Sequence, residues 1–177
     1  GRRHAYRSDR EFHVYLAIIA LAALAIGAVT LPHYEDKLIG VNDVVFTTVS
    51  LQSSTGFAVA NYELWPAAAQ FVLLLVMLIG GCVGSTAGGF KVVRLYLVAK
   101  FIATEFTRLL HPQAVVPVRM RGVAVPRDVI LNVLGFFVLY VFAVIAASLV
   151  VIAFGMDWIS GVSGVVSMLG TMGPGMN

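Results

Sequence analysis

The chain has 177 residues, of which 59% are hydrophobic and only 12% are charged, and its mean hydropathy is +0.91. Soluble domains carry about twice that share of charged residues, so the composition excludes an ordinary soluble domain and indicates an integral membrane protein. The single cysteine, Cys82, excludes an internal disulfide framework and suggests no metal cluster.

The net charge of +3 is distributed unevenly along the chain. All Lys and Arg residues except Lys37 lie between Arg2 and Arg10 or between Lys91 and Arg127. The positive-inside rule therefore predicts that these two regions are cytoplasmic and that the acidic loops are external. A nucleic-acid-binding patch is a weaker interpretation, because the basic residues flank apolar spans.

Residues 1–13 are predicted to be a cytoplasmic lead-in, and the first repeat unit to cover residues 14–98. Val14 to Leu31 is apolar and long enough to span a bilayer. A helix capped by Asn42 or Asp43 follows, and it is too short and too polar to cross. With the glycine turn that ends it, this segment (42–57) predicts a re-entrant pore helix and filter. A surface helix at the membrane interface would not need that turn.

The second span of this unit, residues 64–98, is interrupted by the sequence GGCVGSTAGGFK. A glycine in a helix interior costs about 1 kcal/mol relative to alanine, so five glycines predict a broken helix. A phosphate-binding loop is disfavoured because Phe90 stands where that motif requires lysine. Helix packing is a further alternative, since the small residues also form two small-xxx-small rows.

Residues 99–128 are predicted to be a cytoplasmic connection, helical up to Pro112 and then forming a short hairpin. A second repeat unit follows at 129–177, with a span ending near Gly155, a pore helix and a filter. Its final span is missing, and both ends of the chain are expected to be cuts through a longer protein.

The two units are related by a shift of 117 residues, which places SLQSSTG over SMLGTMG. A pore helix directs the negative end of its dipole inward, which favours a cation. The carbonyl oxygens that follow can replace the hydration shell of the ion. Gly56 and Gly173 occupy equivalent positions and permit the positive φ angles that aim these carbonyls.

The motifs SSTGF, GGCVGSTAGGFKVVR, HPQAVVPV and LGTMGPG, taken in this order, resemble the Trk/Ktr/HKT superfamily of potassium transporters. The similarity is greatest to the bacterial Trk-type membrane subunit, and it covers essentially the whole chain. It implies an all-α integral membrane fold of tandem membrane helix–pore helix–membrane helix repeats with potassium-channel-like architecture. The chain would be the third of four repeats and most of the fourth.

The resemblance assigns residues to three roles. The selectivity filter, where potassium would bind to carbonyl oxygens, would contain Ser53, Ser54, Thr55, Gly56, Gly170, Thr171, Met172 and Gly173. The gate loop below the filter would contain Gly80, Gly81, Gly84, Ser85, Thr86, Gly88 and Gly89. Contacts with a partner would involve Lys91 and Arg94.

The function expected from this resemblance is potassium uptake across the bacterial cytoplasmic (inner) membrane by a multi-pass protein, with potassium as substrate and no cofactor. The expected partners are a cytosolic nucleotide-binding regulatory subunit, a second copy of the full-length membrane subunit and the lipid bilayer, with no nucleic acid. A membrane enzyme is disfavoured because the four histidines are scattered. A non-conducting structural or assembly subunit is the alternative. The choices between potassium and sodium, and between channel and coupled transport, stay open, as does the regulatory nucleotide.

Overall fold

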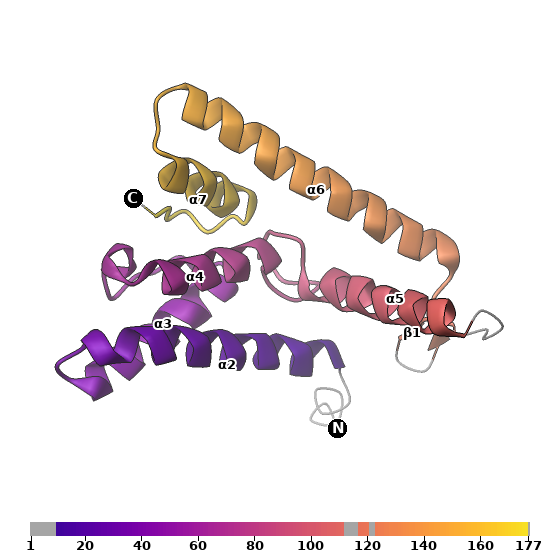
Figure 1. Cartoon of the computed structure of the whole chain (residues 1–177), viewed down its shortest axis with the longest axis horizontal. Helices are drawn as coiled ribbons and strands as arrows, with labels where there is room; N and C mark the ends of the chain where they lie inside the picture. The colour runs from indigo at the N-terminus through magenta and orange to yellow at the C-terminus, as the bar shows by residue number, and fades with distance from the viewer. Residues whose placement is uncertain (1–9, 112–116, 121–122, 177) are drawn as a thin grey trace.

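The computed structural model describes residues 10–111, 117–120 and 123–176, and this part of the chain is mostly helical (Figure 1). Its elements, in chain order, are α2 (Arg10–Thr30), η1 (Leu31–His33), α3 (Lys37–Gln52), η2 (Tyr62–Leu64), α4 (Ala67–Ile79), α5 (Val92–Leu110), β1 (Arg119–Met120), β2 (Val123–Ala124), α6 (Arg127–Ala153) and α7 (Trp158–Leu169).

The helices form two groups, one of α2, α3 and α4 and the other of α5, α6 and α7. Helices α2, α3 and α4 pack on one another, and α7 packs on α6. Figure 1 shows α4 and α5 on either side of an irregular loop, with α5 beneath the first half of α6. Contacts between α4 and α7 and between α2 and α5 join the two groups.

In the part of the chain that the structure describes, two helical segments are long and apolar enough to cross a membrane, Arg10–His33 and Arg127–Ala153. At 1.5 Å per residue, 20 residues span the hydrocarbon core, and these segments have 24 and 27. Much of the surface of α6 is both apolar and exposed, including Val138, Phe142 and Leu149. Such a surface suits contact with lipid or with other membrane helices.

One hydrophobic core joins both helix groups. It includes Ile26 of α2, Leu73 of α4 and Val166 of α7, each of them fully buried. Met172 and Met176, which follow α7, belong to the same core. The segment after α7 is therefore fixed against the first helix group by packing.

Helix α3 starts earlier than the sequence analysis predicts. The N-cap is Asp36 rather than Asn42 or Asp43, and its carboxylate accepts hydrogen bonds from the N–H groups of Leu38 and Ile39 over 2.8 and 3.5 Å. The helix therefore extends over 16 residues. The prediction failed because Asp36 is as good an N-cap residue as Asn42 or Asp43, and the pattern of residues 37–41 fits either a loop or a helix.

Asp157 caps α7 in the same way, accepting from the N–H groups of Ile159 and Ser160 over 3.0 and 3.2 Å. Helix α5 is continuous from Val92 to Leu110, so residues 98 and 99 lie within one helix. The expected short hairpin is present as β1 and β2, which pair Arg119 with Ala124 in antiparallel register.

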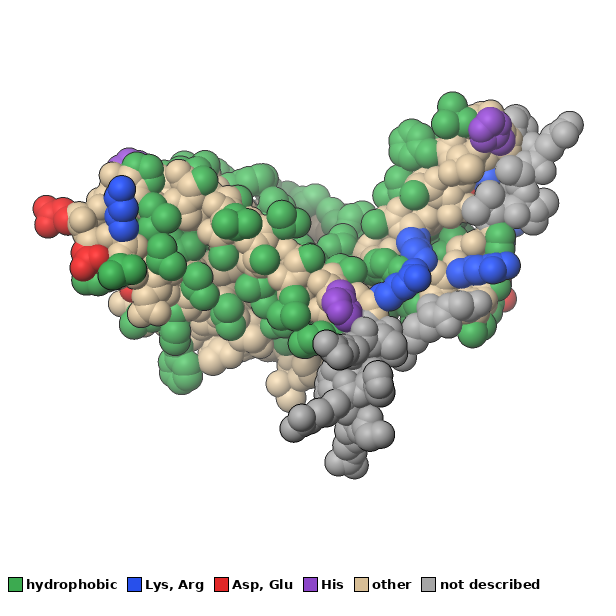
Figure 2. All heavy atoms as spheres, turned by 90° about the horizontal axis from the view of Figure 1, so that it is seen from below, with side chains coloured by type: hydrophobic (Ala, Val, Ile, Leu, Met, Phe, Trp, Pro, Cys, Tyr) green, Lys and Arg blue, Asp and Glu red, His purple; other side chains and the backbone are tan. Residues whose placement is uncertain are grey.

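Charged side chains lie mostly at the ends of the long helices. Figure 2 shows hydrophobic side chains over much of the visible face, with acidic groups gathered at one end and most Lys and Arg groups toward the other. The basic end includes Arg108, Arg119 and Arg127, on α5, the hairpin and the start of α6. The apolar middle is thus bounded by two polar ends, as a membrane-spanning arrangement requires.

We predict that Asp36→Ala lowers the free energy of unfolding by about 0.5–2 kcal/mol, because the first N–H groups of α3 lose their acceptor. Thermal unfolding in detergent would measure the change. Glu35→Ala is the matched control, since Glu35 is an exposed neighbour outside the cap. Equal shifts in the two variants would contradict the capping role.

Candidate functional site

Helices α3 and α7 each end in a tight turn, and the two turns have the same backbone conformation. The C-cap residues Ser53 and Gly170 have φ/ψ values of −82°/−1° and −80°/−5°. The next residues, Ser54 and Thr171, have positive φ angles of 58° and 55°. The residues of each pair are 117 positions apart, so the two turns are equivalent parts of a repeated unit.

The same hydrogen bond closes each turn. The N–H of Thr55 donates to the carbonyl of Ser50 over 2.9 Å, and the N–H of Met172 donates to the carbonyl of Ser167 over 3.0 Å. In both turns the positive-φ residue also donates to the carbonyl three residues earlier, over 3.2 and 3.1 Å. These are the two bonds of a Schellman motif, a common way to end a helix.

Glycine usually occupies the left-handed position of this motif, but here it is Ser54 in one turn and Thr171 in the other. Holding a non-glycine residue in this conformation costs about 1–3 kcal/mol, and such strain clusters at functional sites. The same strain at both equivalent positions makes these turns the candidate site.

The two turns touch each other through their backbones. Gly56 and Gly173 have φ angles of 76° and 100°. A Cβ atom on Gly56 would collide with the carbonyl oxygen of Met172, whereas nothing lies within 4 Å of a Cβ built on Gly173. Glycine at position 56 therefore permits a close approach as well as a positive φ angle.

The first turn carries closely spaced side-chain oxygens. Ser53 Oγ and Thr55 Oγ1 are 2.8 Å apart and share a hydrogen bond. The buried hydroxyls of Ser54 and Ser167 have no hydrogen-bond partner among the described residues. Buried polar groups normally have a partner, so these hydroxyls have capacity for a further group such as a water molecule or an ion.

The segment from Gly80 to Lys91, here called the glycine loop, is not helical. Hydrogen bonds close its neck, from the N–H of Phe90 to the carbonyl of Leu78 over 3.1 Å and from the N–H of Lys91 to the carbonyl of Ile79 over 2.7 Å. Because residues 80–91 are not helical, the small residues of this segment cannot form the continuous small-xxx-small rows of a packed helix.

The glycine loop binds directly to the end of α7. The N–H of Gly88 donates to the carbonyl of Gly170 over 3.2 Å and to Thr171 Oγ1 over 3.1 Å. The N–H of Gly89 donates to the carbonyl of Leu169 over 3.4 Å. A Cβ on Gly88 would lie 2.7 Å from the Leu169 carbonyl oxygen, so this approach requires glycine.

A second connection joins the glycine loop to the end of α3. Gln52, the last residue of α3, is fully buried, and its Nε2 donates to the carbonyl of Gly80 over 2.5 Å. The loop is therefore held by both helices that precede the turns. Gly80 itself packs so closely on Gly88 that a Cβ at position 80 would collide with the Gly88 carbonyl.

Two charged side chains bind the exposed part of the glycine loop. The carboxylate of Glu11, in the first turn of α2, accepts a hydrogen bond from the N–H of Val83 over 2.7 Å. Lys91 Nζ donates to the carbonyl of Ser85 over 3.3 Å. Both side chains lie at the start of a helix, Glu11 in the first turn of α2 and Lys91 at the N-cap of α5.

Aromatic residues of α6 pack around Phe90, near the point where the glycine loop leads into α5. Phe90 is buried and contacts Phe136 and Phe137, with ring centroids 6.1 and 5.1 Å apart. The guanidinium of Arg94 lies 3.9 Å from the centroid of the Phe136 ring. Tyr140 donates a hydrogen bond to the carbonyl of Leu78 over 3.4 Å, so α6 also supports the loop neck.

The structure brings the two groups of predicted site residues together. The two turns lie against each other, and the glycine loop binds the second turn directly and the first through Gln52, the residue that precedes it. Lys91 and Arg94, expected at a partner surface, are both half-buried and bind the loop and α6 of this chain. Sequence reasoning missed Gln52 and Glu11. The signal for Gln52 was a single amide at the end of an apolar helix, and the signal for Glu11 was a carboxylate in a basic segment.

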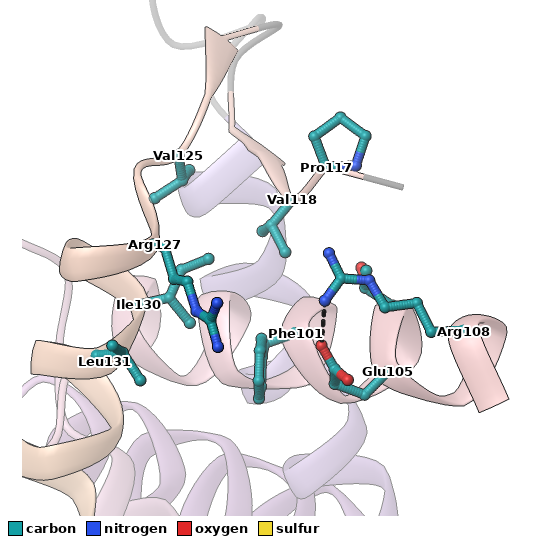
Figure 3. Close-up of a pocket in the computed structure, with 10 residues that line it drawn as sticks. Phe101, Glu105, Arg108, Pro117, Val118, Val125, Arg127, Ile130 and Leu131 are labelled. Atoms are coloured by element: carbon teal, nitrogen blue, oxygen red, sulfur yellow. Dashed lines mark hydrogen bonds and ion pairs between the residues drawn. The ribbon is translucent and has the colours of Figure 1, made fainter. Parts of the chain in front are cut away.

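A separate pocket of about 390 Å3 lies between α5, the hairpin and the start of α6 (Figure 3). Phe101, Val118 and Ile130 supply apolar walls, and Glu105 and Arg108 form an ion pair over 2.7 Å at its edge. The residues that line it do not belong to the turns or the glycine loop. It belongs to the basic end of the molecule.

The sequence profile of the TrkH family, described as "Cation transport protein", matches residues 36–176. The "Trk system potassium uptake protein TrkH" of Vibrio parahaemolyticus is 36% identical over 173 residues, and that of Escherichia coli K12 is 34% identical over 173. Each alignment covers 97% of this chain but only 36% of the relative. This chain thus spans about a third of the length of these relatives.

A solved structure, the "Crystal Structure of the Potassium Transporter TrkH from Vibrio parahaemolyticus", matches with a TM-score of 0.89 and 36% sequence identity. The match covers 97% of this chain and 37% of that chain. The fold described above is therefore similar to part of a known transporter.

We predict that Gly88→Ala destabilises the contact between the glycine loop and α7 by about 1–3 kcal/mol, as expected for overpacking against a backbone. Hydrogen exchange at residues 80–91 of the full-length parent protein should become faster. Gly135→Ala in α6 is the control, because a Cβ there meets nothing within 4 Å. Unchanged exchange in the Gly88 variant would contradict the observed packing.

Proposed function

Because this chain belongs to the TrkH family of cation transport proteins, we propose that its parent protein carries potassium into the cell across the bacterial cytoplasmic membrane. The relatives that match almost all of the chain are named as potassium uptake proteins. The pair of equivalent strained turns at the ends of α3 and α7 carries the proposal, because a repeated cation site gives both turns a reason to be strained.

We propose that the turns form two quarters of a selectivity filter. The ends of α3 and α7 each bear a partial negative charge of roughly half an electron, which favours a cation nearby. Backbone carbonyls then replace the water around the ion. The filter residues would be Ser53, Ser54, Thr55, Gly56, Gly170, Thr171, Met172 and Gly173.

The remaining quarters would come from parts of the parent protein outside this chain. The exposed face of α3 includes Val45, Phe46 and Val49. These residues, with Ser53 and Thr55, line an open groove of about 330 Å3 beside the first turn. Further repeats would cover this apolar face and complete a pseudo-fourfold ring around the ion.

The glycine loop would act as the gate. Non-helical backbone at membrane depth is tolerated only where protein buries it or where it lines a water-filled cavity. The loop meets this condition by hydrogen bonding to the second turn and to Gln52 at the end of α3, directly on the ion path that we propose. The gate residues would be Gly80, Gly81, Gly84, Ser85, Thr86, Gly88 and Gly89.

The basic end of the molecule would face the cytoplasm, in agreement with the positive-inside rule. A cytosolic nucleotide-binding regulatory subunit would contact this end. Lys91 and Arg94 would then act indirectly, through the loop and α6, while the end of α5 and the hairpin meet the partner. We also propose that the full-length membrane subunit pairs with a second copy.

The proposed role is transport and not catalysis. Potassium is the substrate, and carbonyl and hydroxyl oxygens of the turns are its ligands. The relatives are uptake proteins, which fits a role that needs no catalytic side chain.

We predict that Gly173→Asp in the full-length parent protein reduces potassium uptake into liposomes to the level of protein-free liposomes. The φ angle of 100° at this position is strained for any residue with a side chain, although a Cβ there would meet nothing within 4 Å. A loss of uptake would therefore result from a changed backbone, which redirects the carbonyl groups, and not from a steric clash. Gly164→Ala in α7, where a Cβ also meets nothing within 4 Å, should retain uptake. Full uptake by the Gly173 variant would refute the filter assignment.

A further inference from the structure

We infer that Gln52 is a positioning residue that couples the first filter turn to the gate. This inference rests on the proposed function. Gln52 ends α3 immediately before Ser53, and its Nε2 binds the carbonyl of Gly80, where the glycine loop begins. One side chain therefore joins the filter turn to the gate loop.

The burial of Gln52 indicates a specific role. The residue is fully buried, and its Oε1 has no hydrogen-bond partner among the described residues. Burying an amide with one half unpaired is unfavourable, so packing alone would favour an apolar side chain. The Nε2 contact with Gly80 is the interaction that offsets this cost.

The equivalent position in the second unit shows that the fold does not require glutamine. Leu169 lies 117 positions after Gln52, is likewise the last residue of its helix and has an apolar side chain that is 39% exposed. Its backbone carbonyl, and not its side chain, accepts from Gly89. The two units therefore bind the loop differently, by a side chain at α3 and by the backbone at α7.

Loss of the Gln52 contact would act mainly on the docked loop. The carbonyl of Gly80 is buried beside Gly88, so without Nε2 it would lose its partner in the docked state. When the loop leaves the turns, water in the pore can bind the same carbonyl. Coupling free energies between sites correspond to roughly 5–150-fold changes, which is the expected shift toward the released loop.

The test uses the full-length parent protein carrying Gln52→Met, which keeps the side-chain length and removes the donor. Without any cytosolic partner, potassium uptake into liposomes should rise at least about 5-fold, with an unchanged ratio of potassium to sodium uptake. Gln70→Met is the matched control. Its Nε2 also donates to backbone carbonyls, those of Glu63 and Trp65, but at the opposite end of α4.

Cys82 provides a second measurement on the loop itself. It is the only cysteine of this chain and lies half-buried in the glycine loop. Its alkylation rate, followed by mass spectrometry of the Cys82 peptide, should rise about 5-fold or more in Gln52→Met and stay unchanged in Gln70→Met. This readout does not depend on ion flux.

The outcomes separate the inference from the proposed function. Unchanged uptake and unchanged Cys82 alkylation in Gln52→Met would overturn the inference, as would an altered potassium-to-sodium ratio, which would place Gln52 in filter shape alone. A variant that loses uptake with no faster alkylation would also overturn it. If Gly173→Asp retains full uptake, the proposed function fails, whatever the result for Gln52.

Discussion

The need to satisfy backbone hydrogen bonds away from water governs this structure. The chain leaves the helical path at Gly80 and resumes it at Val92, between two segments that are apolar. In hydrocarbon, unpaired N–H and C=O groups cost several kcal/mol each. The N–H groups of Gly88 and Gly89 are paired with the carbonyls of Gly170 and Leu169 at the end of α7. The Gly170 carbonyl also accepts from Thr171 Oγ1 over 2.7 Å. One set of contacts thus satisfies a loop and a helix end at the same time.

Much of this arrangement could be predicted from residue order. Five glycines predict a break in any helix, and the 117-residue shift places the two turns in register before any coordinates are known. The turn residues share a backbone conformation because Schellman geometry is local, and local geometry follows from local sequence. The predicted start of α3 was wrong because Asp36 and Asn42 are both good N-cap residues, and only the packing of the helix decides between them.

The contacts between distant segments could not be predicted in this way. Gln52 and Gly80 are 28 positions apart, and Glu11 and Val83 are 72 apart. A glutamine or glutamate has the same local propensity whether it meets solvent or a loop, so sequence carries little sign of its partner. The same reasoning applies to Lys91 and Arg94, whose charges indicate a surface role although both side chains contact their own chain.

The closed neck of the glycine loop limits how the loop can move. Phe90 and Lys91 are bonded to the last turn of α4, so the ends of the loop are tied together whatever its tip does. A rearrangement would then resemble a flap turning on a fixed base, with α4 and α5 remaining still. Loop motions of this kind take roughly nanoseconds to microseconds, whereas sliding of whole helices takes microseconds to milliseconds. A rearrangement of the loop tip would therefore be fast and would leave α4 and α5 in place.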